Sequence, residues 1–362
     1  MKYLMGIDNG GTFSKAGIFD EEGNQIAVAS VHTVTITPKP GYTERDLNDL
    51  WDVNAQAIRN AIEKRKVVPS DIVGVSFSGH GKGLYMVAEG TPVAAGMFDV
   101  NACGIASGLS DEEQMCMVAG TWSINEFIRK TPVTNGTVAL NSMFCMPGYY
   151  LVEEISPTSA GNMEWFIRNL MSYEREEAKS QGGSIYDVTN KWVEEIEPQD
   201  NNIIFLPFLN GSNEDALAKG TFIGLTAYHN KHHMLRAVYE GIVFSHYTHV
   251  RKLLANREKP ASVRLSGGAA NSDVWVQIFA DVLQIPIDVV GDKELGAQGA
   301  AMAAGIAAGI YQDYPDAIAK SVKITKTVQP RKEYAEIYVE KYANYRKVIE
   351  SLNGAWECFK NN

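Results

Sequence analysis

A glycine turn that carries an aspartate, a hydroxyl and a lysine lies near the start of the sequence. The run is GIDNGGTFSK, residues 6–15. Glycines let the backbone approach a phosphate closely, and exposed N–H groups together with a hydroxyl can bind the phosphate oxygens. The aspartate can hold Mg²⁺ directly or through water. The pattern is typical of a phosphate site, and its plainer alternative is a tight hairpin with a solvated lysine.

A second candidate is Asp99, which follows the apolar run 93–98 and precedes small residues. It therefore stands at the end of a rigid element with room beside it. Such a carboxylate suits a general base that accepts a proton from a substrate hydroxyl. Alternatively, Asp99 caps the helix that we expect from about Asn101. Its position alone does not separate the two interpretations.

Two further glycine turns follow downstream. Gly120-Thr121 lies between two expected strands and again puts a hydroxyl on a hairpin. The run LSGGAAN, residues 265–271, is a junction between a strand and a helix, which can hold a nucleotide at the helix N-terminus. A plain turn is its alternative. Two hydroxyl hairpins, one strand-end aspartate and one glycine junction occur in this order along the chain. Together they favour a functional site over a set of plain turns.

Strands that alternate with helices must position these residues, which indicates an α/β architecture. We expect strands over 3–8, 14–20, 25–33, 72–78, 84–88, 93–98, 115–119, 126–129, 203–209, 263–266 and 287–290. We expect helices over 47–64, capped by Asp46 or Asn48, and over 101–108, 159–171, 185–195, 231–254, 272–283 and 297–308, with an exposed helix over 333–352. The pattern restarts after residue 92, which resembles a duplicated domain.

Composition narrows the possible partners. The 362 residues, 45% of them hydrophobic and 21% charged, suit a globular enzyme of two domains. A net charge of −10 argues against a nucleic-acid partner, although a few N–H groups and one lysine can still hold a small nucleotide. No stretch approaches the roughly 18 apolar residues of a membrane span. The four cysteines form no metal-binding or CxxC pattern, so we expect reduced thiols in a cytoplasmic protein.

In order along the chain, these motifs resemble the FGGY family of carbohydrate kinases, within the actin/hexokinase/Hsp70-like superfamily. The resemblance covers nearly the whole chain: GIDNGGTFSKAGIFD, GHGKG, TPVAAGMFDVNACGIASG, AGTWSINEF, SAGNMEWF, LRAVYEGIVFSHY, LSGGAANSDVWVQIFADVLQIPI and ELGAQGAAMAAG. GHGKGLY and AGMFDVNACGIASG look most like the L-xylulose kinase branch. The resemblance implies two actin-like (ribonuclease H-like) domains around a nucleotide cleft. These are an incomplete sugar-side domain over 1–90 and a domain over 91–362 with the catalytic base and the adenosine site.

The resemblance also implies a role for individual residues. Asp99 matches the base that contacts and deprotonates the sugar hydroxyl, and Asp8 matches the aspartate that organises Mg²⁺. His80 and Lys82 fall where relatives contact the sugar. Because Lys82 lies between two glycines, the alternative interpretation is that it is a solvated residue of a turn. The residues that fall on nucleotide-binding segments are Gly11, Thr12, Ser14 and Lys15 on the first phosphate hairpin, Gly120 and Thr121 on the second, and Gly161, Gly267, Gly268 and Asn271 at the base and ribose.

The implied activity is transfer of the γ-phosphate of ATP, with Mg²⁺, to a hydroxyl of a ketose such as L-xylulose or a related pentulose or sugar acid. Such kinases are often dimers, so the resemblance allows a homodimer. The chain departs from the family in length, because family members are usually well over a hundred residues longer. In this sequence residues 85–90 are followed directly by residues 91–93, where the family has the rest of the first domain. Either the chain is an internal-deletion form, or the sequence lacks a stretch. The alternative function is therefore a nucleotide-binding actin-like protein with little or no sugar phosphorylation.

Overall fold

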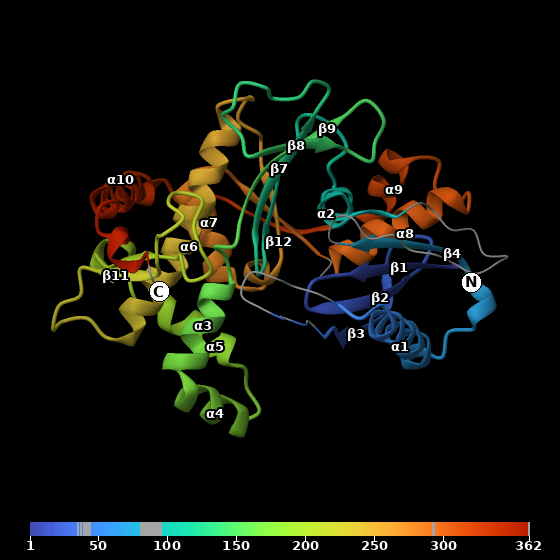
Figure 1. Ribbon diagram of the computed structural model, residues 1–362, viewed down its shortest axis with the longest axis horizontal. Helices are drawn as coiled ribbons and strands as arrows, with labels where there is room; N and C mark the ends of the chain where they lie inside the picture. The colour runs from blue at the N-terminus through green and yellow to red at the C-terminus, as the bar shows by residue number, and fades with distance from the viewer. Residues whose placement is uncertain (35, 37, 39–44, 80–95, 292–293, 361–362) are drawn as a thin grey trace.

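The structure is a computed structural model that describes residues 1–34, 36, 38, 45–79, 96–291 and 294–360. Within these residues the chain forms two large β-sheets with helices between and around them (Figure 1). The strand order is β3-β2-β1-β4-β5 in the first sheet and β14-β13-β12-β6-β7-β9-β8 in the second. The predicted α/β class is confirmed.

The first sheet is built on the hairpin that carries the first glycine turn. Its strands are β1 (Tyr3–Asn9), β2 (Phe13–Phe19), β3 (Gln25–His32), β4 (Ile72–Gly79) and β5 (Met97–Phe98). β1 pairs antiparallel with β2 and parallel with β4. Parallel neighbours need a crossover, and α1 (Leu47–Arg65) supplies it. The Asp46 carboxylate, one of the two caps that we expect from the sequence, caps this helix by accepting from the backbone N–H of Asn48 and Asp49.

The second sheet repeats this connectivity. Its strands are β6 (Cys116–Ala119), β7 (Ser123–Arg129), β8 (Leu140–Met143), β9 (Tyr150–Ser156), β12 (Val263–Ser266), β13 (Ile287–Val290) and β14 (Ile324–Val328). β6 and β7 form an antiparallel hairpin, and β12 pairs parallel with β6. The order β9-β7-β6-β12-β13 thus corresponds to β3-β2-β1-β4-β5 in the first sheet. The repeated pattern in the sequence has this topological counterpart, although β8, β9 and β14 are not predicted from the sequence.

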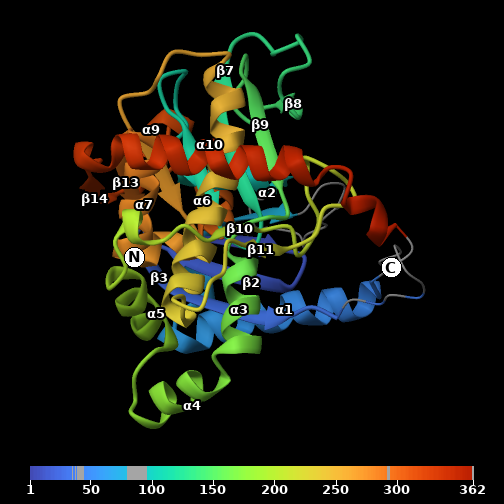
Figure 2. The same ribbon diagram turned by 90° about the vertical axis from the view of Figure 1, so that its left-hand side faces the viewer.

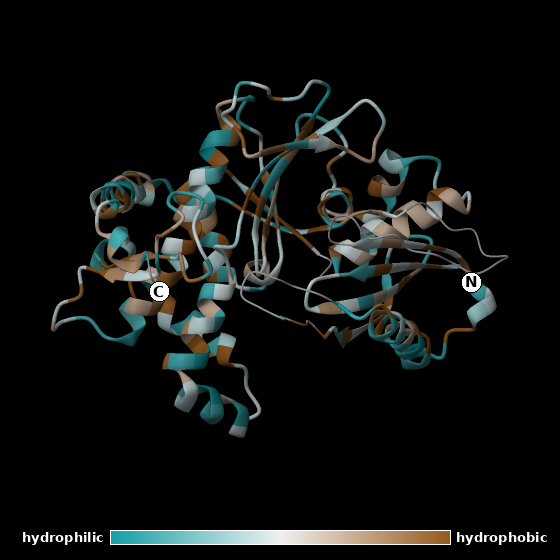
Figure 3. Cartoon of the chain, viewed as in Figure 1, coloured by the Kyte–Doolittle hydropathy of each residue, from teal (hydrophilic) through white to brown (hydrophobic). Residues whose placement is uncertain are grey.

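Two helices of small residues lie between the sheets, α2 (Asp99–Ala106) and α8 (Leu295–Ala307) (Figure 1). α8 packs on β1, β4 and α2. A Cβ at Gly6 of β1 would collide with the backbone carbonyl of Ala297, and one at Gly299 would collide with that of Ala102. These helices therefore meet their neighbours backbone to backbone. In Figure 3, α8 is pale brown to white, whereas α1 on the opposite face of the first sheet is predominantly teal.

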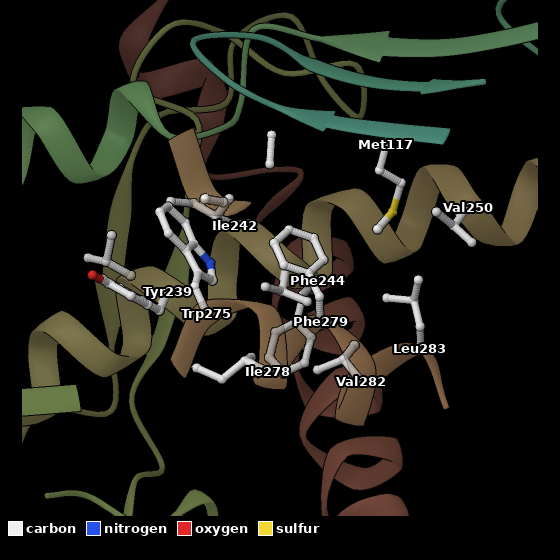
Figure 4. Close-up of a cluster of buried hydrophobic side chains, with 14 of the residues drawn as sticks. Met117, Tyr239, Ile242, Phe244, Val250, Trp275, Ile278, Phe279, Val282 and Leu283 are labelled. Carbon is white, nitrogen blue, oxygen red and sulfur yellow. The ribbon is translucent and has the colours of Figure 1, made fainter. Parts of the chain in front are cut away.

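The largest core lies between the second sheet and its covering helices, α6 (Lys231–Leu254) and α7 (Asp273–Leu283) (Figure 4). Trp275 and Phe279 of α7 are completely covered there. Helix α10 (Ala335–Leu352) crosses α6 in Figure 2. The prediction that this helix is exposed is wrong along one face, because Tyr338, Tyr342, Tyr345 and Ile349 recur at helical spacing and are buried.

The remaining elements complete the second half of the chain. They are α3 (Gly161–Leu170), α4 (Ser172–Ser180), α5 (Ile185–Glu194), β10 (Ile204–Leu206), β11 (Thr221–Ile223) and α9 (Tyr314–Ser321). Of these, α4, β11 and α9 are not predicted from the sequence. All four cysteines are free, as expected. None of the helices that the structure describes is long and apolar enough to cross a membrane.

Three predictions fall outside the described residues. They are the strand over 84–88, the sugar contacts His80 and Lys82, and the domain boundary between residues 90 and 91. The division into 1–90 and 91–362 therefore stays a prediction.

Gly299→Ala tests the backbone contact between α8 and α2. Alanine is favoured over glycine in a helix by about 1 kcal/mol. The new Cβ would nevertheless meet the Ala102 backbone, so we expect a net loss of roughly 1–3 kcal/mol in the free energy of unfolding. Urea denaturation measures the change. Gly354→Ala, where no atom lies within 4 Å of the new Cβ, is the control. A Gly299→Ala protein as stable as the parent would show that the helices do not touch this closely.

Candidate functional site

A cleft of about 640 Å³ is lined by both β-hairpins and by the start of α8. Seven residues that the sequence singles out line it: Asp8, Lys15, Gly120, Thr121, Gly267, Gly268 and Asn271. They come from three motifs far apart in the sequence. The fold therefore brings the two hydroxyl hairpins and the glycine junction to one place.

Asp8 stands at the end of β1, on the face that α8 covers. Its Oδ1 lies 3.0 Å from Ser78 Oγ, which is also 3.1 Å from the carbonyl oxygen of Gly296. A Cβ at Gly296 would come within 2.7 Å of Asp8 Cγ, so only glycine lets α8 begin directly against the carboxylate. The side chain of Asp8 is thereby fixed by a strand on one side and a helix start on the other.

The charges around Asp8 are mainly negative. Burial raises the pKa of Asp8; Ser78 and Lys15 oppose this, and the nearby carboxylates of Asp99 and Glu294 add to it. Lys15 Nζ is 2.7 Å from Glu294 Oε2, so this lysine is already paired with a carboxylate. Three carboxylates against one lysine make a site that favours a cation.

This arrangement fits Mg²⁺ that is shared with a substrate. Among the residues that the structure describes, no three His, Cys, Asp or Glu side chains are placed to hold a metal by themselves. Mg²⁺ does not require such a cage, because it usually keeps water ligands and binds one or two carboxylates together with phosphate oxygens. A fixed Asp8, with the carboxylates of Asp99 and Glu294 nearby, matches that need.

The glycine junction leaves open space on the cleft side. A Cβ at Gly268 would have only the Ala119 carbonyl oxygen nearby, at 4.0 Å. Gly267 differs, because its φ is +86° and its Cβ would approach Ala119 to 2.8 Å. The backbone conformation at position 267 therefore requires glycine, whereas the absence of a side chain at Gly268 leaves space for a ligand in the cleft. Asn271 Nδ2 donates to the Gly268 carbonyl oxygen at 3.3 Å.

The first hairpin and α3 contribute less directly. The side chain of Ser14 is buried and donates from Oγ to Asn54 Oδ1 at 2.5 Å, so it faces α1 rather than the cleft. Gly11 and Thr12 lie exposed at the turn and are not among the cleft residues. Gly161, the first residue of α3, adjoins the second hairpin: its Cβ would lie 3.7 Å from the Thr121 carbonyl oxygen.

Asp99 is the first residue of α2, and its N-cap is Phe98. Its Oδ1 accepts from the backbone N–H of Val100 at 2.9 Å. The residue is half-buried and its charge acts on Asp8, although it is not part of the cleft lining. The structure thus puts a further carboxylate, at a helix start, near enough to raise the pKa of Asp8.

Two buried carboxyls behind Asp99 are not predicted from the sequence. Glu126 and Glu153 pair directly across β7 and β9, and both side chains are completely buried. Neither Glu126 oxygen has a hydrogen-bond partner among the described residues, whereas Glu153 Oε2 accepts from Ser142 Oγ at 3.3 Å. Burial raises the pKa of Glu126 well above its usual range, with Glu153 and Asp99 adding to the effect. Burial likewise raises the pKa of Glu153 to about 7. The signal that could have found them is a glutamate within each of two apolar strands.

Comparison with known proteins identifies the family. The model described as "FGGY family of carbohydrate kinases, C-terminal domain" matches residues 115–308, and the corresponding N-terminal domain model matches residues 3–102. The chain belongs to the FGGY family of carbohydrate kinases. It is accordingly an ATP-dependent sugar phosphotransferase, and the resemblance seen in the sequence is confirmed.

The similar proteins include sugar kinases of known name. The L-xylulose/3-keto-L-gulonate kinase of Escherichia coli is 25% identical over 499 positions, which cover 98% of either chain. The probable L-xylulose kinase of Haemophilus influenzae is 24% identical, with 97% of this chain and 99% of the relative covered. Each alignment runs over 499 positions, whereas this chain has only 362 residues. The aligned span of each relative therefore includes many residues that face a gap in this chain and have no counterpart here.

Solved structures show the same fold. The ligand-bound xylulose kinase of Lactobacillus acidophilus superposes with a TM-score of 0.84 at 18% identity and covers 99% of this chain and 100% of that one. The xylulose kinase of Rhodospirillum rubrum gives a TM-score of 0.81 at 17% identity, with 98% and 100% covered. The predicted actin-like architecture is therefore confirmed.

Because the pKa values of Glu126 and Glu153 are raised in the folded protein, we expect the free energy of unfolding to fall as pH rises. In the unfolded chain both carboxyls titrate near pH 4.5, whereas in the folded chain Glu153 keeps its proton to about pH 7 and burial holds the pKa of Glu126 well above 4.5. The folded state thus binds more protons than the unfolded state above about pH 4.5. The free energy of unfolding therefore decreases as pH rises through 7.

Glu126→Gln should make this decline shallower, because one of the two buried carboxyls can no longer ionise. Thermal unfolding of parent and variant between about pH 5 and pH 8 measures the slope. Glu340→Gln, at an exposed position of α10, is the control and should follow the parent. An equally steep decline in Glu126→Gln would contradict a proton-holding pair.

Gly268→Val tests the predicted nucleotide role of the junction. The added side chain meets open space, so the protein should fold with unchanged stability, but it fills part of the cleft. We expect ATP affinity to fall at least tenfold, about 1.4 kcal/mol. Calorimetric titration with Mg·ATP measures it, and Gly354→Val, at a residue that does not line the cleft, is the control. Equal ATP affinity in Gly268→Val and the parent would remove this junction from the site.

Proposed function

We propose that this chain transfers the γ-phosphate of ATP to a hydroxyl of a ketose such as L-xylulose, or of a related pentulose or sugar acid. The observation that carries the proposal is the convergence of Asp8, the Gly120-Thr121 hairpin and the Gly267-Gly268 junction on one cleft. The substrate class is supported by the names of the relatives aligned along nearly the whole chain, an L-xylulose/3-keto-L-gulonate kinase and two probable L-xylulose kinases.

In this proposal ATP lies along the second hairpin and the glycine junction. Gly268 offers backbone without a side chain, so a phosphate or ribose can approach closely. Thr121 is exposed in the cleft and adds a hydroxyl. Gly161 begins α3 beside this hairpin and supplies N–H groups of a helix start.

Asp8 is the residue that would hold Mg²⁺, directly or through water. The ion supplies neutralisation of phosphate charge when it is bound. Lys15 supports the same region from β2. Because it is paired with Glu294, it can turn to a phosphate only by exchanging one anionic partner for another.

Asp99 accepts the proton of the sugar hydroxyl. As the first residue of α2, it is fixed by the packing of this helix against α8. Phosphoryl transfer needs little covalent help from the protein, so positioning and electrostatics account for most of the rate. The role assigned to Asp99 is therefore to face the acceptor hydroxyl and to take up its proton.

A second candidate function is nucleotide binding with little or no sugar phosphorylation. It is favoured by the long part of the relatives that has no counterpart in this chain. A direct assay separates the two functions. Purified protein is incubated with Mg·ATP and L-xylulose, D-xylulose, 3-keto-L-gulonate or gluconate, and the phosphorylated sugar is detected by mass spectrometry. ATP binding without any sugar phosphate would favour the second function.

Asp99→Asn tests the proposed base. The substitution keeps the shape of the side chain and removes the proton acceptor, so we expect sugar phosphorylation to fall by roughly 10²–10⁴-fold. The affinity for ATP should barely change, because Asp99 does not line the cleft that we assign to the nucleotide. Coupled measurement of ADP release gives the rate. Turnover of sugar by Asp99→Asn at the parent rate would refute the role.

A further inference from the structure

A buried histidine of α6 contacts three segments that lead to the cleft. The side chain of His246 is completely buried. Its Nδ1 lies 2.9 Å from Asn125 Oδ1 and 3.1 Å from Ser123 Oγ, and its Nε2 lies 3.0 Å from Ser159 Oγ. The ring also forms a T-shaped pair with Phe279, at a centroid distance of 5.3 Å. One imidazole thus contacts β7, the loop before α3 and helix α7.

The hydrogen bonds fix the state of this ring. Burial lowers the pKa of His246 to about 3, and His249 adds to the effect, so the imidazole is neutral with one donor and one acceptor. The amide of Asn125 donates from Nδ2 to the Glu154 carbonyl oxygen at 3.2 Å, which leaves its Oδ1 to accept. His246 Nδ1 therefore donates to Asn125, and Nε2 accepts from the Ser159 hydroxyl.

Two of the ring's neighbours, Ser123 and Ser159, lead directly to the cleft. Ser123 Oγ lies 3.1 Å from Nδ1 and also accepts from Asn125 Nδ2 at 3.0 Å. Ser123 begins β7 immediately after the second hairpin, and Ser159 lies two residues before Gly161. The two segments are also joined to each other, because Ala160 N–H donates to the Gly120 carbonyl oxygen at 2.9 Å. The hairpin and the start of α3 are therefore bonded together and to the same buried ring.

We propose that His246 is a positioning residue that sets the second hairpin and the start of α3 in the arrangement that binds ATP. The inference rests on the proposed nucleotide site. His246 itself touches no substrate, because it is buried and does not line the cleft. It acts through Ser123 and Ser159, whose backbones continue into the residues that the proposal assigns to ATP.

The same helix offers a matched comparison. His249, one turn further on, is also buried and binds Glu154 Oε2 at 2.9 Å and Ser156 Oγ at 3.1 Å. Glu154 and Ser156 belong to β9, and neither lines the cleft. A loss of buried polar contacts at His249 should therefore lower stability without acting on ATP. Ser156→Ala and Ser159→Ala form a second comparison, since each removes one hydroxyl from one histidine. Ser156→Ala also removes the contact of Ser156 Oγ with Thr158 Oγ1 at 2.6 Å, so this control loses at least as many buried polar contacts as Ser159→Ala.

The experiment measures the dissociation constant for Mg·ATP by calorimetry in His246→Phe, Ser159→Ala, His249→Phe and Ser156→Ala, with thermal unfolding of each. Ser159→Ala removes one hydrogen bond of the buried ring and should weaken ATP binding roughly five- to tenfold. His246→Phe removes that bond and the one to Asn125, so its loss should be at least as large. The two controls should bind ATP like the parent even where they unfold at lower temperature. In variants that phosphorylate sugar, the KM for sugar should stay within about twofold of the parent's.

The double variant His246→Phe/Ser159→Ala sharpens the test. Because the contact of Ser159 with His246 is lost in both single variants, the loss of ATP affinity in the double variant should be smaller than the product of the two single losses. If His246→Phe does not fold, Ser159→Ala against Ser156→Ala decides the question.

ATP binding unchanged in Ser159→Ala, or weakened equally in both serine variants, would overturn the inference while the nucleotide site stands. A parent protein that binds no ATP would overturn the proposed nucleotide site and the inference with it.

Discussion

The contact of α8 with β1 and α2 is the constraint on which the cleft depends. At Gly6 and Gly299 there is no space for even a methyl group, so the distance between these elements is set by their backbones. Because Gly296, the second residue of α8, lies against the Asp8 carboxylate, this packing also fixes where the helix meets the end of β1. Asp99 at the start of α2 is brought near Asp8 by the same contact, since α2 packs on α8.

The carboxyls that gather around this contact are costly to the fold. Removing a charged carboxyl from water is unfavourable unless it is paired, and Glu126 in particular is buried without a hydrogen-bond partner among the described residues. A neutral, protonated Glu126 reduces this cost and leaves less negative charge behind Asp99. Local conflicts of this kind are common where a fold serves a site rather than its own stability.

In the sheet formed by β6, β7 and β9, different kinds of polar group lie on the two faces. Glu126 and Glu153 share one face, whereas Asn125 and Glu154, their neighbours in sequence, share the other with the histidines of α6. Successive side chains of a strand point to opposite faces, so this division follows from the pleat. The acidic face borders α2, and the histidine face supports the loops that lead to the hairpin. The sequence order of these residues gives no hint of the separation until the register of β7 and β9 is known.

The sequence by itself determined the elements with strong local signals and the motifs between them. The bounds of α6, β12 and β13 agree with expectation to the residue, because capping by Asn230 and the apolar runs define them locally. The glycine turns at Gly120 and Gly267 were also predicted as special positions. Only the tertiary structure decided that Ser14 turns away from the cleft, that Lys15 pairs with Glu294 and that one face of α10 is buried. It alone revealed β8 and β9, whose polar residues hide the strand pattern. The physical reason is that pairing and burial depend on residues distant in sequence, whereas turns, caps and apolar periodicity are set by neighbours along the chain.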